Sequence, residues 1–144
     1  MRYIVWGETM STLFYSTLVD GQTYAFNPAT DLVDIDIALS ASQLLASGTT
    51  TTLLSGGGKS VTLSVALAKL TSAMFLFGDS SLLKIGDNAI ANTADALPNL
   101  LNGGGGSDQL IGLGGGDTLI GGNGADLSWA APATTRSTGA RTMT

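Results

Sequence analysis

Residues 103–129 read GGGGSDQLI GLGGGDTLI GGNGADLSW, three consecutive segments of nine residues that each begin with glycine. Aspartate stands at the sixth position of every segment, as Asp108, Asp117 and Asp126. Leu110 and Leu119 occupy the eighth position of the first two segments, where the third has Ser128. Of the 20 glycines in the chain, 11 lie in this stretch. A flexible glycine-rich linker would not place aspartate at every ninth position, so the period predicts a repetitive structure.

The glycine-rich half of each segment is expected to form a turn, and the half that begins at aspartate a short strand. Each segment then makes half a coil of a flattened solenoid with leucine in a narrow core. Asp108 and Asp126 stack on one edge, one strand spacing of about 4.8 Å apart, and Asp117 lies on the other edge. Stacked carboxylates repel each other. Calcium between them removes the repulsion, because Ca²⁺ takes about six to eight oxygen ligands, whereas Mg²⁺ demands a tighter octahedral geometry.

The same composition couples metal binding to folding. Glycine loses more backbone entropy on ordering than other residues, roughly 0.5–1 kcal/mol relative to alanine. Only a thin row of leucine and isoleucine offsets this loss. Without metal the segment is expected to be disordered, so the free energy of binding contributes to folding.

The pattern resembles the G-G-x-G-x-D-x-U-x nonapeptide of the RTX family of calcium-binding proteins, in which U is a large apolar residue. The resemblance implies a parallel β-roll that binds Ca²⁺. The implied ligands are the aspartates together with the first and third residues of the segments: Asp108, Asp117, Asp126, Gly103, Gly105, Gly112, Gly114, Gly121 and Asn123. Upstream, residues 99–102 resemble a degenerate repeat with Asn99 in the ligand position, which would cap the array or pair across from Asp117.

The preceding region reads as short β segments. Three hairpins are predicted around turns at Asp20-Gly21, residues 55–59 and residues 78–81. Val33, Ile35 and Ile37 alternate with aspartate, which predicts a half-buried strand with these three residues facing inward. Short helices are expected at residues 40–46, where Ser40 and Gln43 form a capping box, and at residues 66–70.

The sequence as a whole predicts an all-β protein: a small β domain of short strands and hairpins followed by a short parallel β-roll, an RTX-like solenoid. Four regions are expected: an all-β N-terminal region at 1–85, a transition with a degenerate repeat at 86–102, the calcium-binding roll at 103–129, and a disordered tail at 130–144.

Composition excludes several functions. The chain has no Cys and no His, which removes disulfides, thiolate and imidazole catalysis and most transition-metal sites. Eleven acidic against six basic residues argue against a nucleic-acid partner. No apolar run is long enough for a membrane span, and residues 1–12 lack the apolar stretch of a signal peptide. Residues 56–60 lack the first glycine of a P-loop. A second calcium site at Asp31, Asp34 and Asp36 is disfavoured against a solvated strand face, and no catalytic residue is assigned.

The resemblance implies a non-catalytic calcium-binding module of a secreted bacterial-type protein. The alternative is a non-catalytic C-terminal fragment of a larger secreted RTX hydrolase, toxin or adhesin. Type I export is the route used by similar proteins, although the tail lacks the apolar and acidic ending expected of that signal. A cell-surface or glycan partner is a weaker possibility, for which the β region offers aromatic residues: Tyr3, Trp6, Tyr15, Tyr24 and Phe26.

Overall fold

The computed structural model describes residues 10–91, 95–130 and the backbone of 136–138. The expected all-β character is confirmed there, because each helical segment is only three residues long. The strands are β1 (Thr12–Phe14), β2 (Thr23–Tyr24), β3 (Leu32–Ile35), β4 (Leu45–Ser47), β5 (Thr52–Gly56), β6 (Lys59–Leu63), β7 (Phe75–Phe77), β8 (Leu83–Ile85), β9 (Leu100–Gly105), β10 (Gln109–Ile111), β11 (Thr118–Asn123), β12 (Leu127–Trp129) and β13 (Arg136–Thr138). The 3-10 helices are η1 (Tyr15–Thr17), η2 (Ala41–Gln43), η3 (Leu67–Lys69) and η4 (Ser72–Met74).

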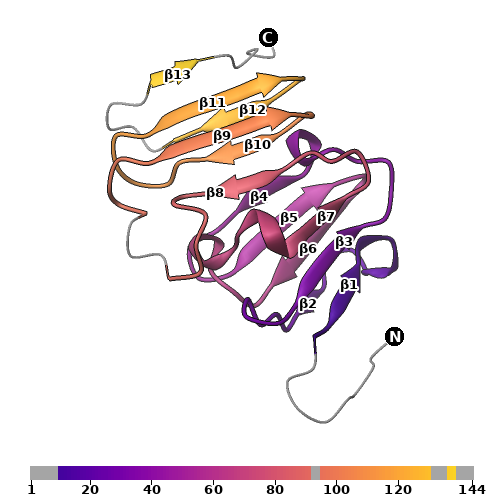
Figure 1. Cartoon of the computed structure of the whole chain (residues 1–144). Helices are drawn as coiled ribbons and strands as arrows, with labels where there is room; N and C mark the ends of the chain where they lie inside the picture. The colour runs from indigo at the N-terminus through magenta and orange to yellow at the C-terminus, as the bar shows by residue number, and fades with distance from the viewer. Residues whose placement is uncertain (1–9, 92–94, 131–135, 139–144) are drawn as a thin grey trace.

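Two sheets make up the N-terminal part of the molecule (Figure 1). One contains the parallel strands β1, β3 and β7, and the other has the order β2-β6-β5-β4. The predicted β5–β6 hairpin is confirmed, with Gly56 paired to Lys59 across a two-residue turn. Gly57 and Gly58 both have positive φ, 58° and 81°, which is the conformation that such a tight turn requires.

The other two predicted hairpins are wrong. The Asp20-Gly21 turn does form, since the N–H of Gln22 donates to the carbonyl of Val19 at 3.2 Å. The strands on either side then separate, because β1 pairs with β3 and β2 pairs with β6. In the same way β7 pairs with β3 whereas β8 pairs with β10. The residues of a turn determine that the chain reverses direction there. Contacts between residues that are distant in the sequence determine which strands pair.

The predictions for residues 33–37 and for the helix start at Ser40 agree more closely with the structure. Val33 and Ile35 are buried as expected, and Ile37 is half-buried just beyond β3. The N–H of Ser40 donates to the Gln43 side chain at 3.0 Å, and η2 begins there. The expected helix at residues 40–46 is nevertheless only one turn, because β4 begins at Leu45.

From β8 onward, successive strands alternate between two parallel sheets, which are stacked in Figure 1. Strands β8, β10 and β12 form one sheet, and β9, β11 and β13 form the other. Within each sheet the repeat strands pair residues 18 positions apart, for example Gln109 with Leu127. Leu101, Leu110 and Leu119 form a small separate core between the sheets. The third segment contributes β12 although Ser128 replaces its leucine, because the backbone pairing with β10 continues.

Strand β8 joins the two parts. Leu83 and Ile85 are buried in the N-terminal core, and they pair with Gln109 and Ile111 of β10. Ile111 belongs to the same core. The expected boundary after residue 85 thus falls at the end of a strand that belongs to the first sheet of the repeats.

The tail differs from the expected disorder at Arg136–Thr138, which form β13 beside β11. The rest of the tail, residues 131–135 and 139–144, lies outside the described residues, as do residues 1–9, which are most of the segment expected to lack a signal peptide. In the part of the chain that is described, no helix has the length and apolar character needed to cross a membrane.

Candidate metal centre

Asp108 and Asp126 stack at the edge where the chain enters β10 and β12. The N–H of Asp108 donates to Oδ1 of Asp126 at 3.0 Å. Oδ1 of Asp108 in turn accepts the N–H of Leu82 at 2.7 Å. Asp108 is 0% exposed and Asp126 is 5% exposed. This is the arrangement that the nine-residue period predicts for the first and third segments.

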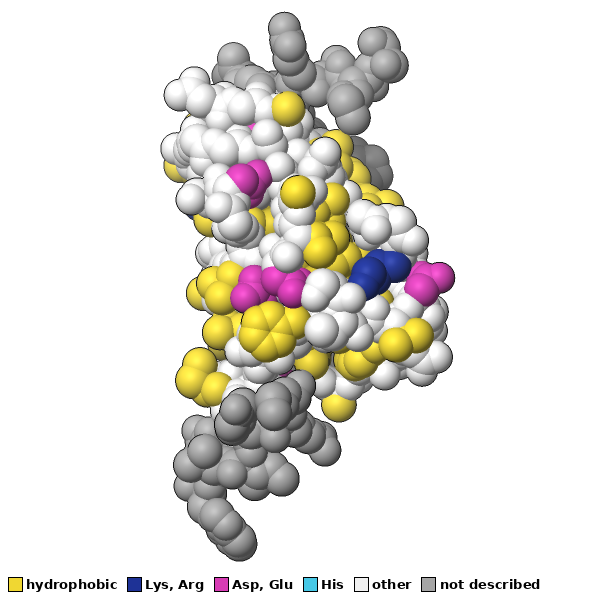
Figure 2. All heavy atoms as spheres, turned by 90° about the vertical axis from the view of Figure 1, so that its right-hand side faces the viewer, with side chains coloured by type: hydrophobic (Ala, Val, Ile, Leu, Met, Phe, Trp, Pro, Cys, Tyr) yellow, Lys and Arg dark blue, Asp and Glu magenta, His cyan; other side chains and the backbone are white. Residues whose placement is uncertain are grey.

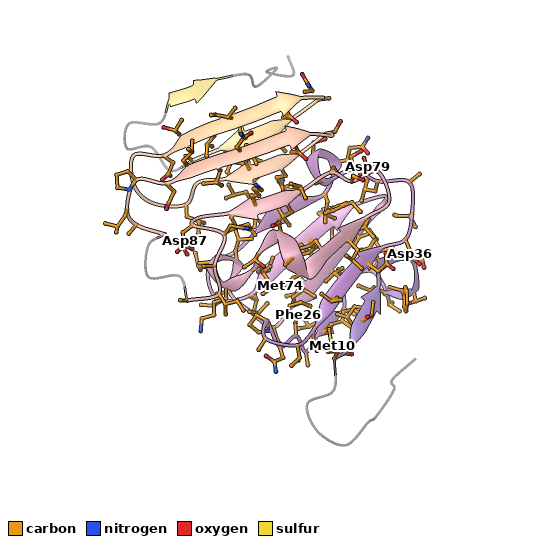
Figure 3. All side chains as sticks on the ribbon, viewed as in Figure 1. Met10, Phe26, Asp36, Met74, Asp79 and Asp87 are labelled. Carbon is orange, nitrogen blue, oxygen red and sulfur yellow. The ribbon has the colours of Figure 1, made fainter. Side chains whose placement is uncertain are left out.

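Asp117 lies at the opposite edge, where the chain enters β11. Its Oδ1 accepts the N–H of Asn99 at 3.0 Å, and the carbonyl of Asn99 accepts the N–H of Thr118 at 2.7 Å. Asn99 therefore lies across from Asp117, which is one of the two arrangements that the degenerate repeat predicts. Figure 3 labels Asp79 and Asp87, which precede and follow β8 and lie at the two opposite ends of the stacked strands.

The second oxygen of each repeat aspartate is buried without a hydrogen-bond partner. These atoms are Oδ2 of Asp108, Asp117 and Asp126. The first glycine of each segment makes room for this oxygen, because a Cβ built on that glycine would lie within 3.0 Å of it. The pairs are Gly103 with Asp108, Gly112 with Asp117, and Gly121 with Asp126. Any side chain at these glycines would displace the carboxylate.

An ionised carboxylate with one unsatisfied buried oxygen is costly. Burial raises the pKa of Asp108 above its ordinary value of 3.8. The N–H of Leu82 opposes this rise in the pKa, and the negative charge of Asp126 adds to it. The site therefore favours either a proton or a cation beside Asp108.

The other implied ligands divide between the two edges. Gly103, Gly105, Gly121 and Asn123 lie at the C-terminal ends of β9 and β11, where Gly105 pairs with Asn123, on the edge of Asp108 and Asp126. The carbonyl of Asn123 already accepts the N–H of Gly106 at 3.0 Å. Gly112 and Gly114 lie in the turn before Asp117. The implied ligands thus form a set of six residues at the edge that contains Asp108 and Asp126, and a set of three at the edge that contains Asp117.

The donor set fits calcium. Among the described residues, no three acidic side chains converge as a ready-made metal cluster. An ion at these edges would take the carboxylates in stacked pairs and complete its shell with backbone carbonyl oxygens, and Ca²⁺ accepts this mixture. The absence of Cys and His from the chain leaves oxygen as the ligand type, which suits a hard cation.

The sequence analysis did not identify two buried polar residues, Asp95 and Gln109. Asp95 is 7% exposed, and its Oδ2 also has no partner. A Cβ on Gly86 would lie within 3.0 Å of its carboxylate, but Asp95 stands nine positions after Gly86 and not five positions, as in the repeats, so the nonapeptide pattern does not reveal the pair. Gln109 is fully buried, and neither atom of its amide has a hydrogen-bond partner. No sequence signal marks Gln109.

Two of the three aspartates considered for a second calcium site, Asp31 and Asp36, accept hydrogen bonds within the protein. Oδ2 of Asp31 accepts the N–H of Asn27 at 2.8 Å. Asp36 accepts both the N–H and the hydroxyl of Ser16, which lowers the pKa of Asp36. Among the described residues, these carboxylates are not part of a group of three acidic side chains.

The described aromatic candidates for glycan binding, Tyr15, Tyr24 and Phe26, offer little surface. Tyr15 and Phe26 are buried and Tyr24 is half-buried, whereas Tyr3 and Trp6 lie outside the described residues. On the face shown in Figure 2, basic atoms occupy a small area beside an acidic side chain. Among the described residues, this face therefore shows no extended basic patch of the kind that binds a phosphate backbone.

Comparison of the chain with protein-family models, curated proteins and solved structures finds no match in any of the three. What distinguishes the candidate site is its own geometry: stacked aspartates, each with one oxygen fixed by a backbone N–H and the other buried and unpaired.

Proposed function

We propose that this protein binds Ca²⁺ through RTX-type repeats at residues 103–129, and that the ions order β9 to β12 as a parallel β-roll. The observation that carries the proposal is the set of buried carboxylate oxygens without a donor, Oδ2 of Asp108, Asp117 and Asp126. The alternation of successive strands between two parallel sheets supports the β-roll. In this proposal the module has no catalytic role and belongs to a secreted protein. Such a protein lies outside the cell, where calcium is abundant.

The residues around the site have separate tasks. The N–H groups of Leu82 and Asp108 hold one oxygen of each stacked aspartate, which orients the other oxygen inward. The first glycine of each segment excludes side chains from the same space. When bound, the ion supplies the positive charge that the buried carboxylates lack. Because the free chain would have to bury these charges unpaired, folding of the strands and binding of the ion are coupled.

The experiment is a far-UV circular dichroism titration with CaCl₂, starting from protein stripped with EGTA. We expect β signal to rise with CaCl₂ and not with MgCl₂. The variant Asp108→Ala/Asp126→Ala should lose this response. The control Asp20→Ala/Asp34→Ala removes the same formal charge from the N-terminal part and should keep it.

An unchanged spectrum up to about 10 mM CaCl₂ would contradict the proposal, because extracellular calcium modules bind in the range of about 0.1–1 mM. A calcium response that survives in Asp108→Ala/Asp126→Ala would show that the ion binds elsewhere.

A further inference from the structure

A second pair of buried carboxylates lies at the edge opposite Asp108 and Asp126. One member is Asp117, from the second repeat, and the other is Asp95, from the segment before the repeats. Asp117 is 1% exposed and Asp95 is 7% exposed. Oδ2 of each has no hydrogen-bond partner. This edge therefore contains two buried carboxylates, each with one oxygen that has no hydrogen-bond partner.

Each carboxylate stands over a glycine. A Cβ on Gly86 would lie within 3.0 Å of Oδ1 of Asp95, and a Cβ on Gly112 within 3.0 Å of Oδ2 of Asp117. Gly86 and Gly112 are neighbours just beyond the ends of adjacent strands, since each follows one member of the pair Ile85 and Ile111 in β8 and β10. The N–H of Gly86 donates to the carbonyl of Ile111 at 2.8 Å. The two carboxylates thus stand over neighbouring backbone positions, which lie about 4.8 Å apart in a sheet.

The two turns that present these carboxylates are fixed to each other at both ends. The carbonyl of Asp95 accepts the N–H of Gly114 at 3.0 Å. Oδ1 of Asp117 accepts the N–H of Asn99 at 3.0 Å. These two hydrogen bonds hold the turns together, so movement of one turn alone does not relieve the repulsion between the two carboxylates.

The same relation holds at the first edge, where Asp108 and Asp126 stand over the neighbouring glycines Gly103 and Gly121. We infer that Asp95 and Asp117 hold a second Ca²⁺, with backbone carbonyls completing its shell, at the edge opposite the Asp108–Asp126 site. The inference rests on the proposed calcium binding and adds a ligand from outside the repeats. One divalent ion at each edge balances the two negative charges of its carboxylate pair.

The test is the number of calcium ions bound by the full chain, measured by isothermal titration calorimetry and by native mass spectrometry. Asp95→Asn keeps an acceptor for the N–H of Asp87, which now donates to Oδ1 of Asp95 at 2.9 Å, and removes only the charge. We expect Asp95→Asn to lose one of two bound ions. Asp126→Asn should lose the other ion, and the control Asp34→Asn should keep both.

A second variant covers the case in which Asp95→Asn does not fold. Asp117→Asn should lose the same ion, and Asp95→Asn/Asp117→Asn should lose no further ion, because both residues serve one site. Circular dichroism at saturating CaCl₂ reports whether each variant is folded.

The outcomes separate the two proposals. If Asp95→Asn binds as many ions as the wild-type chain with equal affinity while Asp126→Asn loses one, the Asp95 site is overturned and the repeat site stands. If the double variant loses more than Asp117→Asn alone, the two residues serve different sites and the inference is also overturned. If the wild-type chain binds no calcium, both proposals fail together.

Discussion

Asp31 and Asp108 are both buried aspartates, but their surroundings differ. Oδ1 of Asp31 accepts the Thr30 hydroxyl at 3.1 Å and Oδ2 accepts the N–H of Asn27 at 2.8 Å, so both oxygens are used. Only Oδ1 of Asp108 has a partner. Among the described residues, every buried side-chain polar atom without a partner belongs to residues 95–126. The described N-terminal part provides hydrogen-bond partners for its buried side-chain polar atoms, whereas the C-terminal part buries carboxylate oxygens without a partner.

Lys59 extends the comparison. Its ammonium group donates to the carbonyl oxygens of Tyr15, Ser16 and Leu18 at 2.8, 3.1 and 2.9 Å. It also lies 5.1 Å from the centre of the Tyr15 ring. A covalently attached cation among backbone carbonyls thus orders the chain near η1. In the C-terminal strands we propose that calcium takes this role.

The largest expected effect compares one leucine from each core. Leu63→Ala should lower the free energy of unfolding by about 2–5 kcal/mol in both calcium and EGTA, because it leaves a cavity in the N-terminal core. Leu119→Ala should have a comparable effect in calcium only, because its core lies between the strands that we propose to fold on binding calcium. Urea unfolding followed by circular dichroism gives both values. An equal loss for Leu119→Ala in EGTA would show that the strands are folded without metal.

The next effect compares two glycines of β9. Gly103→Ala should destabilise the calcium-loaded protein by about 1–3 kcal/mol, because the methyl group would meet the Asp108 carboxylate. Gly105→Ala places its methyl group in open space and should change stability by less than about 1 kcal/mol. Thermal unfolding in calcium measures both variants. Equal destabilisation by the two variants would argue against the proposed role of Gly103.

A smaller effect is expected at Lys59. Lys59→Met removes three charged hydrogen bonds at a half-buried site, so we expect a loss of about 1–2 kcal/mol. The loss should be the same with and without calcium. Lys69→Met removes the same charge from an exposed position in η3 and should be close to neutral. A calcium-dependent loss in Lys59→Met would mean that the two parts do not fold independently of the ion.

The smallest effect is a difference in pH dependence. Burial raises the pKa of Asp108 above 3.8 in the folded protein, so the folded form binds more protons, and in EGTA the equilibrium between unfolded and folded strands should shift toward the folded form as pH falls toward 3.8. The Ser16 hydroxyl and N–H lower the pKa of Asp36, so its contribution should be lost only as pH falls below 3.8. Hydrogen exchange measured on peptides from each part distinguishes the two trends. Loss of protection in both parts above pH 3.8 would contradict this prediction.

The sequence predicts the features that are written into short or periodic segments. The β5–β6 hairpin needs only Gly57 and Gly58 between two apolar runs, and the stacking of Asp108 with Asp126 follows from their spacing. The hairpin at Asp20-Gly21 fails because β2 finds its partner in β6, about forty residues away. Pairing over such a distance depends on packing of the whole core, which local patterns do not encode.

The candidate site shows the same limit. Asp117 is visible in the sequence because its glycine, Gly112, lies five residues before it, at the same spacing as in the other repeats. Asp95 meets its glycine only after an irregular turn from Gly86. That Asp95 and Asp117 lie at one edge becomes apparent only when the pairing of β8 with β10 is known.

The 18-residue register of the repeat strands constrains how this chain can change in length. Gln109 and Leu127 occupy equivalent places in neighbouring strands of one sheet, and Thr118 and Leu100 do so in the other. A duplication of 18 residues would add one strand to each sheet and preserve every downstream contact. A duplication of nine would exchange the two sheets for everything that follows, so β12 would lose its place beside β10. The structural period of the repeats is therefore 18 residues, so we expect tolerated duplications to contain nonapeptides in pairs.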